Sequence, residues 1–218
     1  MNKKFRHGRG IQLCEDNSKY LGYWSYDRPN GFGKLEQDNG NYLEGTWVKG
    51  QLNGYGKLVQ NGSTYEGQFK NCKQEGEGKE IWNDGAFYEG HYENGLRNGK
   101  GKFIWAEGTI YEGIFEDNYL NGYGKIIFSD KRQYEGEWKH NKIDGKGKFE
   151  WTDGSIYEGE YKDDKKNGFG IFKWPDGRIY KGNWKDGKQD GEGEFFSPKI
   201  QKWKKGKWEN GKRIIWHN

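Results

Sequence analysis

The sequence lacks long apolar runs. Only 31% of its 218 residues are hydrophobic, and the mean hydropathy is −1.29. No apolar stretch approaches the length of a transmembrane helix. The first ten residues, MNKKFRHGRG, have no apolar segment of the kind found in secretory signals. These absences predict a cytoplasmic protein.

Such low hydropathy, taken alone, would favour disorder. The aromatic fraction of 17% indicates the opposite, because disordered chains contain few rings. The chain has 37 glycines and only 3 prolines. We therefore expect a folded chain whose apolar surface comes from rings spaced by glycine.

Cysteine and net charge are also scarce. Cys14 and Cys72 stand in unrelated contexts, which favours two reduced thiols over a disulfide. The 37 basic and 33 acidic residues leave a net charge of +4, which excludes a strongly basic nucleic-acid coat. We expect no nucleic-acid partner.

A period of about 23 residues runs along nearly the whole chain. The glycine of a Tyr-Glu-Gly motif recurs at Gly22, Gly45, Gly67, Gly90, Gly113, Gly136, Gly159, Gly182 and Gly206. A Gly-x-Gly pair recurs at Gly8, Gly31, Gly54, Gly76, Gly99, Gly122, Gly145, Gly168 and Gly191. This periodicity is typical of a repeat array without a linker.

Each half of the repeat alternates with a period of two, which predicts β-strands. Tyr157, Gly159 and Tyr161 should point to one face, with the intervening glutamates on the other. Asp-Gly or Asn-Gly dipeptides between the halves predict hairpin turns.

The register of one hairpin can be predicted from its rings and glycines. Pairing Trp174 with Tyr180 sets Phe172 opposite Gly182 and Gly170 opposite Trp184. The pairing is then centred on Gly177, which we expect in the left-handed region of a three-residue loop. The same rule centres the preceding hairpin on Gly154 and sets Phe149 opposite Gly159.

Repeated YEGxW, GxG and DG segments, as in IYEGEYKDDKKNGFGIFKWPDG, resemble the MORN (membrane occupation and recognition nexus) repeat. The resemblance implies an all-β fold, an elongated single twisted antiparallel sheet of consecutive β-hairpins. We expect one array over residues 1–218, with about eight full 23-residue units and partial units at both ends. The second unit departs from the pattern, because Leu43 stands at the Tyr position.

The sequence shows no constellation for catalysis. GNWKDGK and GKWENGK match only the first part of a phosphate-binding loop, because neither continues with Ser or Thr. The four histidines fall in different repeats, and the repeated glutamates occupy equivalent environments, unlike a catalytic pair. We predict a protein that is not an enzyme and has no catalytic, cofactor-binding or metal site.

Two groups of residues are candidates for binding a partner. The middle residue of Gly-x-Gly is aromatic at Phe32, Tyr55, Tyr123 and Phe169 and should face away from the other rings. The alternative is that these rings only shield the backbone. The second group is the basic segment with Lys202, Trp203, Lys204, Lys205 and Lys207, whose alternative role is to protect a terminal strand from aggregation.

The resemblance implies a non-catalytic scaffold for protein–protein interaction, with other proteins of a larger assembly as partners. Short all-MORN proteins are similar to components of cytoskeletal and ciliary assemblies, including the radial spoke head, so a cytoskeletal or axonemal location is expected. A homodimer or strand-edge pairing is a further expectation. The alternative function is a membrane-associated adaptor that binds anionic lipid such as phosphoinositide through its basic end.

Overall fold

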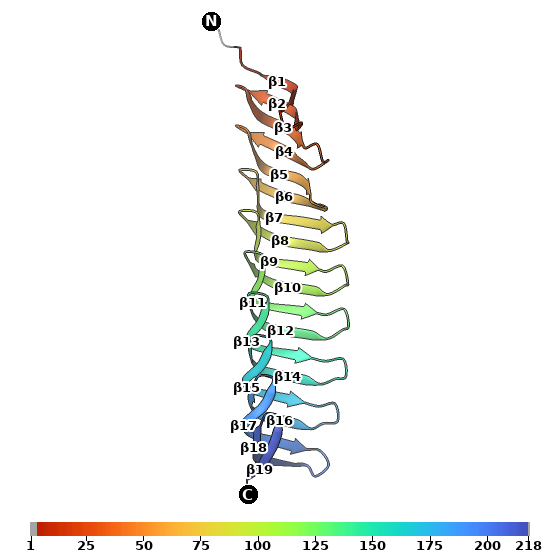
Figure 1. Ribbon diagram of the computed structural model, residues 1–218, viewed down its shortest axis with the longest axis vertical. Helices are drawn as coiled ribbons and strands as arrows, with labels where there is room; N and C mark the ends of the chain where they lie inside the picture. The colour runs from red at the N-terminus through yellow and green to blue at the C-terminus, as the bar shows by residue number, and fades with distance from the viewer. Residues whose placement is uncertain (1–3, 218) are drawn as a thin grey trace. The chain divides into compact units, whose positions relative to one another are not determined.

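The computed structural model describes residues 4–217 and contains no helix among them (Figure 1). The strands of the first half are β1 (Gly8–Leu13), β2 (Lys19–Ser25), β3 (Arg28–Glu36), β4 (Tyr42–Val48), β5 (Gln51–Gln60), β6 (Ser63–Lys70), β7 (Lys73–Trp82), β8 (Phe87–Glu93) and β9 (Leu96–Ile104). Those of the second half are β10 (Ile110–Glu116), β11 (Tyr119–Ile127), β12 (Gln133–Lys139), β13 (Lys142–Glu150), β14 (Ile156–Lys162), β15 (Lys165–Lys173), β16 (Ile179–Lys185), β17 (Lys188–Ser197), β18 (Lys202–Glu209) and β19 (Lys212–Trp216).

Within each part of the chain the strands form an antiparallel sheet in which neighbours in sequence are neighbours in the sheet. The chain forms two compact units, one from Met1–Ala106 and Glu116–Asn118 and the other from Glu107–Phe115 and Tyr119–Asn218. We call them the N-terminal and C-terminal units. In the first, each strand from β1 to β8 pairs antiparallel with the next. Strands β11 to β19 of the second do the same. The prediction of an all-β fold of consecutive antiparallel hairpins is confirmed.

The hairpin loop between β15 and β16 has the predicted length. The amide of Trp174 donates to the carbonyl of Arg178 at 2.9 Å, and the amide of Gly177 donates to the carbonyl of Trp174 at 3.0 Å. Gly177 has a φ of +84°, in the left-handed region that glycine adopts without a steric penalty. The loop is therefore a three-residue loop that ends in a left-handed glycine.

The predicted register is wrong. Phe172 pairs with Tyr180, and the two glycines Gly170 and Gly182 face each other. The pairing is centred on Asp176 because the left-handed glycine is the last of the three loop residues, not the middle one. The hairpin around Gly154 shows the same shift, with Phe149 opposite Tyr157.

The glycines make room for a ring, although not for the rings that the predicted register implied. A Cβ atom on Gly170 would lie 2.5 Å from Cζ of Tyr157, so the tyrosine of the paired strand, not Trp184, covers this glycine. A Cβ on Gly159 would meet the Cα of Gly170 at 2.5 Å and the Tyr157 hydroxyl at 2.7 Å, and Phe149 is not among these nearest atoms. Because the two facing glycines have no side chain, the tyrosine ring can pack directly on the backbone of both strands.

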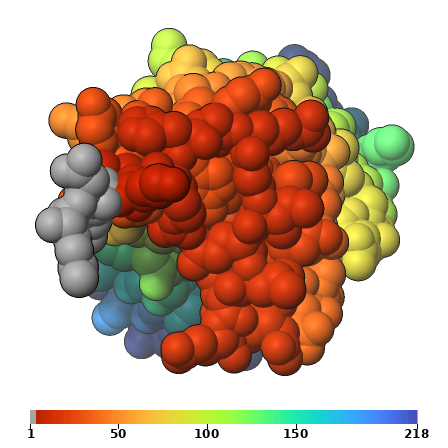
Figure 2. Space-filling model, turned by 90° about the horizontal axis from the view of Figure 1, so that it is seen from above, coloured from red at the N-terminus to blue at the C-terminus, as the bar shows by residue number. Residues whose placement is uncertain are grey.

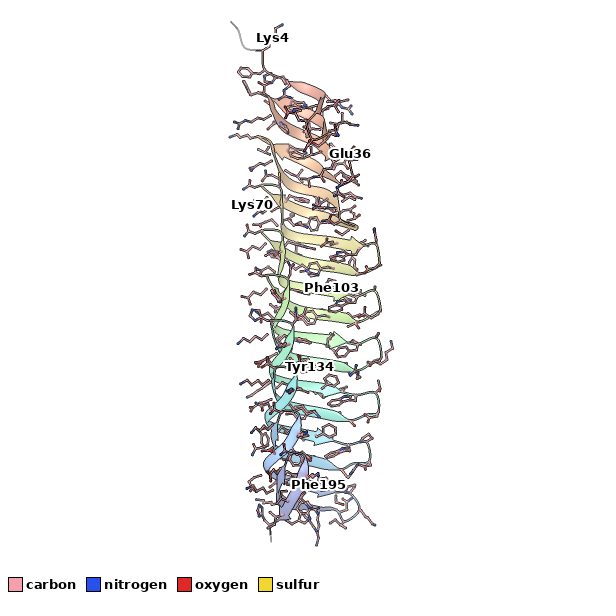
Figure 3. The ribbon with its side chains drawn as sticks, viewed as in Figure 1. Lys4, Glu36, Lys70, Phe103, Tyr134 and Phe195 are labelled. Atoms are coloured by element: carbon pink, nitrogen blue, oxygen red, sulfur yellow. The ribbon has the colours of Figure 1, made fainter. Side chains whose placement is uncertain are left out.

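A ladder of buried tyrosines follows from this arrangement. It consists of Tyr20, Tyr65, Tyr88, Tyr111, Tyr134, Tyr157 and Tyr180. Each ring is at most 3% exposed. Each hydroxyl donates to the backbone carbonyl three residues further on, at 2.9–3.2 Å. Burial raises the pKa of Tyr180 to about 12, so these hydroxyls stay protonated donors at neutral pH. Figure 3 labels Tyr134 as one member of this ladder.

The second repeat, where Leu43 replaces the tyrosine, fills the gap differently. Leu52 is fully buried, and its methyl carbons would lie 3.0 Å from a Cβ on Gly45 or Gly56. Leu52 therefore occupies the space above the glycine pair that a tyrosine ring fills in other repeats.

The N-terminal strand β1 leaves apolar side chains in solvent. Ile11 is 65% and Leu13 is 74% exposed. In the space-filling view, the first strands (red) cover much of the face that is turned toward the viewer (Figure 2). This exposure is compatible with the predicted strand-edge pairing, which stays a prediction.

Two tyrosines at equivalent repeat positions provide a matched test of hydroxyl burial. Tyr92 donates to Glu80 at 3.0 Å, whereas the buried Tyr161 hydroxyl has no hydrogen-bond partner among residues 4–217. We expect Tyr161→Phe to raise the free energy of unfolding by about 1 kcal/mol, because it removes an unsatisfied group. Tyr92→Phe should lower it by about 1.5 kcal/mol, because Glu80 loses its donor. Urea unfolding measures both, and shifts of the same sign would contradict the assignment.

Candidate partner-binding surface

The Gly-x-Gly pair forms a bulge that turns its middle residue outward. Between the pairs Tyr161–Lys166 and Gly159–Gly170, β14 advances by two residues and β15 by four. The first glycine of the pair, Gly168, has a φ of +78°. Such a bulge leaves residues outside the ladder and redirects their side chains. Phe169 therefore points away from the tyrosine ladder. We call this side the outer face and the side of the ladder the inner face.

The four predicted aromatic residues are all exposed. Phe32 is 58% and Tyr55 69% exposed in the N-terminal unit, and Tyr123 is 58% and Phe169 47% exposed in the C-terminal unit. The outward orientation expected from the sequence is confirmed. A role in binding stays a prediction, because exposure alone does not identify a partner.

The structure brings two of these residues together. Tyr123 and Phe169 line one hollow of about 460 Å³ on the outer face of the C-terminal unit. Lys146, the middle residue of the intervening Gly-x-Gly pair, also lines it. The glycines Gly136, Gly147 and Gly159 contribute bare backbone to its surface. We call this site the Tyr123–Phe169 hollow.

Charges surround the Tyr123–Phe169 hollow. The Tyr123 hydroxyl donates to Glu135 at 3.1 Å, and this hydrogen bond raises the pKa of Tyr123 above its ordinary value. Lys125 lies 3.8 Å from the same carboxylate. Lys146 lies opposite Glu160 across the strands and Glu158 opposite Lys148, but in the described part of the chain neither Lys146 nor Glu158 forms an ion pair. These two side chains are therefore available to charged groups of a partner.

This arrangement has features of a binding surface. Glycine backbone allows another chain to approach closely, and exposed rings on a rigid sheet are typical anchors of an interface. Residues 4–217 contain no group of three or more His, Cys, Asp or Glu that could hold a metal ion. No helix in this range is long and apolar enough to cross a membrane.

The basic segment does not form one patch. β18 alternates, so Trp203, Lys205 and Lys207 lie on the outer face, whereas Lys202 and Lys204 lie on the inner face. Trp203 is 48% exposed.

The outer lysines of β18 have acidic neighbours. Lys205 lies 3.6 Å from Glu194, and Lys207 pairs across the strands with Glu192. β18 itself is not the last strand, because it pairs with β19 as well as with β17. Protection of a terminal strand by the basic end stays a prediction, since Lys212 and Arg213 lie on β19.

Sequence reasoning did not place Lys146 in a common site with Tyr123 and Phe169. The sequence does place Lys146 at the middle of Gly-x-Gly in the repeat that lies between the repeats of Tyr123 and Phe169. Only the three-dimensional arrangement shows that three consecutive repeats line one hollow.

The MORN repeat family matches eight segments of the chain, residues 20–42, 44–64, 65–87, 88–110, 111–131, 134–156, 157–177 and 180–199. These segments cover well over half of the sequence. The chain belongs to the MORN repeat family.

Two solved structures match the chain at low sequence identity. The wild-type TCP10 domain of CPAP from Danio rerio is 10% identical, with a TM-score of 0.49 over 95% of this chain and 99% of that one. The TCP domain of SAS-4 (dCPAP) from Drosophila melanogaster, in complex with a proline-rich motif of Ana2, is 14% identical, with a TM-score of 0.40 over 92% and 90%. Among curated protein sequences there was no match.

Proposed function

We propose that this MORN-repeat chain is a non-catalytic scaffold that docks a partner protein on the Tyr123–Phe169 hollow. The observation that carries the proposal is the placement of two exposed rings and an unpaired lysine around bare glycine backbone. An extended peptide segment fits such a surface, because its backbone can lie against the glycines while one apolar side chain contacts the rings. The unpaired Lys146 and Glu158 would select the charges that flank this anchor.

For the assembly to which the scaffold belongs, we propose only the class. The family resemblance favours a cytoskeletal or ciliary assembly, and a cytoplasmic, cytoskeleton-associated location follows from it. A homodimer remains a second arrangement that measurement of the solution mass would reveal.

The membrane alternative has less support. Phosphoinositide binding needs several lysines on one surface, but Lys202 and Lys204 lie on the opposite face from Lys205 and Lys207. Glu194 and Glu192 oppose the latter two across the strands. Vesicles containing phosphatidylinositol 4,5-bisphosphate should therefore not sediment the protein at 0.15 M salt. Cosedimentation that is lost on replacing the four lysines with alanine would favour the alternative.

Variants of the two ring pairs test the docking proposal. The purified chain, the double variant Tyr123→Ser/Phe169→Ser and the matched double variant Phe32→Ser/Tyr55→Ser are each used to recover partners from native cells. Quantitative mass spectrometry compares the recovered proteins. We expect partners that the first double variant loses by tenfold or more, as for residues at the centre of an interface. The matched variant should retain them.

A partner set that is unchanged in Tyr123→Ser/Phe169→Ser would overturn the hollow as the docking site. A partner set that is lost only in Phe32→Ser/Tyr55→Ser would place docking on the N-terminal unit instead. Circular dichroism of each variant serves as the control that the sheet stays folded when the exposed rings are replaced.

A further inference from the structure

Lys166 occupies a position on the inner face whose residue type varies from repeat to repeat. It stands two residues before the first glycine of Gly-x-Gly, where some repeats have Arg6, Pro29, Gln74, Arg97 and Gln189 and three others have the aliphatic Leu52, Leu120 and Ile143. Those three side chains are at most 8% exposed. Arg6 and Arg97 place a guanidinium over aromatic rings at the same position, whereas Lys166 is the one primary amine among these residues.

Four aromatic rings surround the amine. The Nζ atom of Lys166 lies 4.5 Å from the centroid of Phe172, 4.8 Å from Trp184, 4.9 Å from Trp151 and 5.3 Å from Tyr157. Tyr157 and Trp184 are themselves buried. The rings attract the cation by their faces but remove the water that would solvate it.

No carboxylate balances this amine. Lys166 forms no ion pair within the described range 4–217, whereas its neighbour Lys165 lies 3.7 Å from Asp186. The titratable groups that face Lys166 are the hydroxyls of Tyr157 and Tyr161 on β14, the latter directly opposite on the paired strand. From β16 and the end of β13, the amine is faced by the rings of Trp184 and Trp151.

We propose that Lys166 is the reactive amine of this chain and a site of acyl modification that accepts the acyl group of a thioester. The neutral Nζ attacks the thioester carbonyl carbon, and an N–C bond forms as the C–S bond breaks. The thiolate leaves with the electron pair of that bond and takes up the proton that nitrogen loses. The products are an amide and a free thiol, so the step needs no oxidant, reductant or further reactant.

The surroundings favour both the reaction and its product. Desolvation lowers the pKa of Lys166 to about 8, so about a tenth of this amine is neutral at pH 7. An exposed lysine, with a pKa of about 10.4, is neutral in fewer than about one molecule in a thousand. The amide carries no charge, so it suits a position surrounded by four aromatic rings.

Competitive acylation of the whole chain tests the proposal. The chain is treated at pH 7.0 with a limiting amount of S-acetyl-N-acetylcysteamine, a small acyl thioester. Peptide mass spectrometry compares acetylation of Lys166 with that of Lys165, the adjacent exposed lysine. We expect Lys166 to react at least fivefold faster, with the ratio falling toward one as the pH rises to 10. Equal or slower reaction of Lys166 at pH 7.0 would overturn the proposal, since the rings would then only shield the amine.

A second variant tests whether the rings cause the selectivity. Trp151→Leu admits water to the amine and should reduce the Lys166 to Lys165 ratio at pH 7.0 by about threefold or more. Circular dichroism checks that the variant keeps its sheet. An unchanged ratio in the folded variant would contradict the role of the aromatic site, while the wild-type ratio remains interpretable if the variant does not fold.

Discussion

Replacing Gly170 with alanine should lower the free energy of unfolding by about 3 kcal/mol, at the upper end for overpacking of a close-packed interior. The added Cβ would lie 2.5 Å from Cζ of Tyr157, whose ring is fully buried and cannot move aside. Urea unfolding followed by tryptophan fluorescence measures the change.

Gly10 provides the matched control, because it occupies the same position in its own repeat. Nothing lies closer to its added Cβ than two Trp24 atoms at 3.5 Å, an ordinary contact distance. Gly10→Ala should therefore change the free energy of unfolding by less than about 0.5 kcal/mol. Equal losses in the two variants would show that backbone conformation, not the covering tyrosine, requires glycine here.

Truncation of a ladder tyrosine should cost still more. Tyr134→Ala is expected to lower the free energy of unfolding by about 4 kcal/mol, as for other buried rings replaced by alanine. The Tyr134 ring is fully buried, and its centroid lies 5.3 Å from that of Trp138 and 5.5 Å from that of Tyr161. Its loss would open a cavity above the paired glycines and leave the Glu137 carbonyl without its donor.

Tyr55→Ala is the control for the same chemical change on the outer face. Tyr55 is 69% exposed, so its replacement should cost less than about 0.5 kcal/mol. Thermal and urea unfolding of both variants measure the difference. A loss for Tyr55→Ala close to that for Tyr134→Ala would contradict the assignment of inner and outer faces.

The strands, their faces and the turn type were predictable from the sequence because each depends on local pattern. The alternation of Tyr157, Gly159 and Tyr161 predicts one inner face, and both tyrosines are buried. The Asp-Gly dipeptide predicts a left-handed glycine, and Gly177 adopts that conformation.

The register was not predictable by the same reasoning. Pairing Phe172 with Gly182 or with Tyr180 leaves every side chain on the same face, because the two registers differ by two residues. Only the place of Gly177 within the loop distinguishes them. The expectation that glycines make room for rings is confirmed. The ring that covers Gly170, however, is that of Tyr157, which lies diagonally across from it and not directly opposite.

The candidate site was predictable in part. The exposure of Tyr123 and Phe169 follows from their position in the repeat, whereas the hollow between them depends on the packing of strands from three repeats. Lys166 could not be distinguished from the many other lysines of the sequence. Only the folded chain brings four rings from different repeats around its amine.

Hydroxyl-radical footprinting of the assembly purified from native cells tests the docking surface most directly. The oxidation of each aromatic side chain is compared between the free chain and the assembly. We predict that Tyr123 and Phe169 are protected in the assembly by about fivefold or more, as expected for rings at the centre of an interface. Phe32 and Tyr55 should be less affected. Unchanged oxidation of Tyr123 and Phe169, together with protection of the inner-face Trp174, would contradict the account.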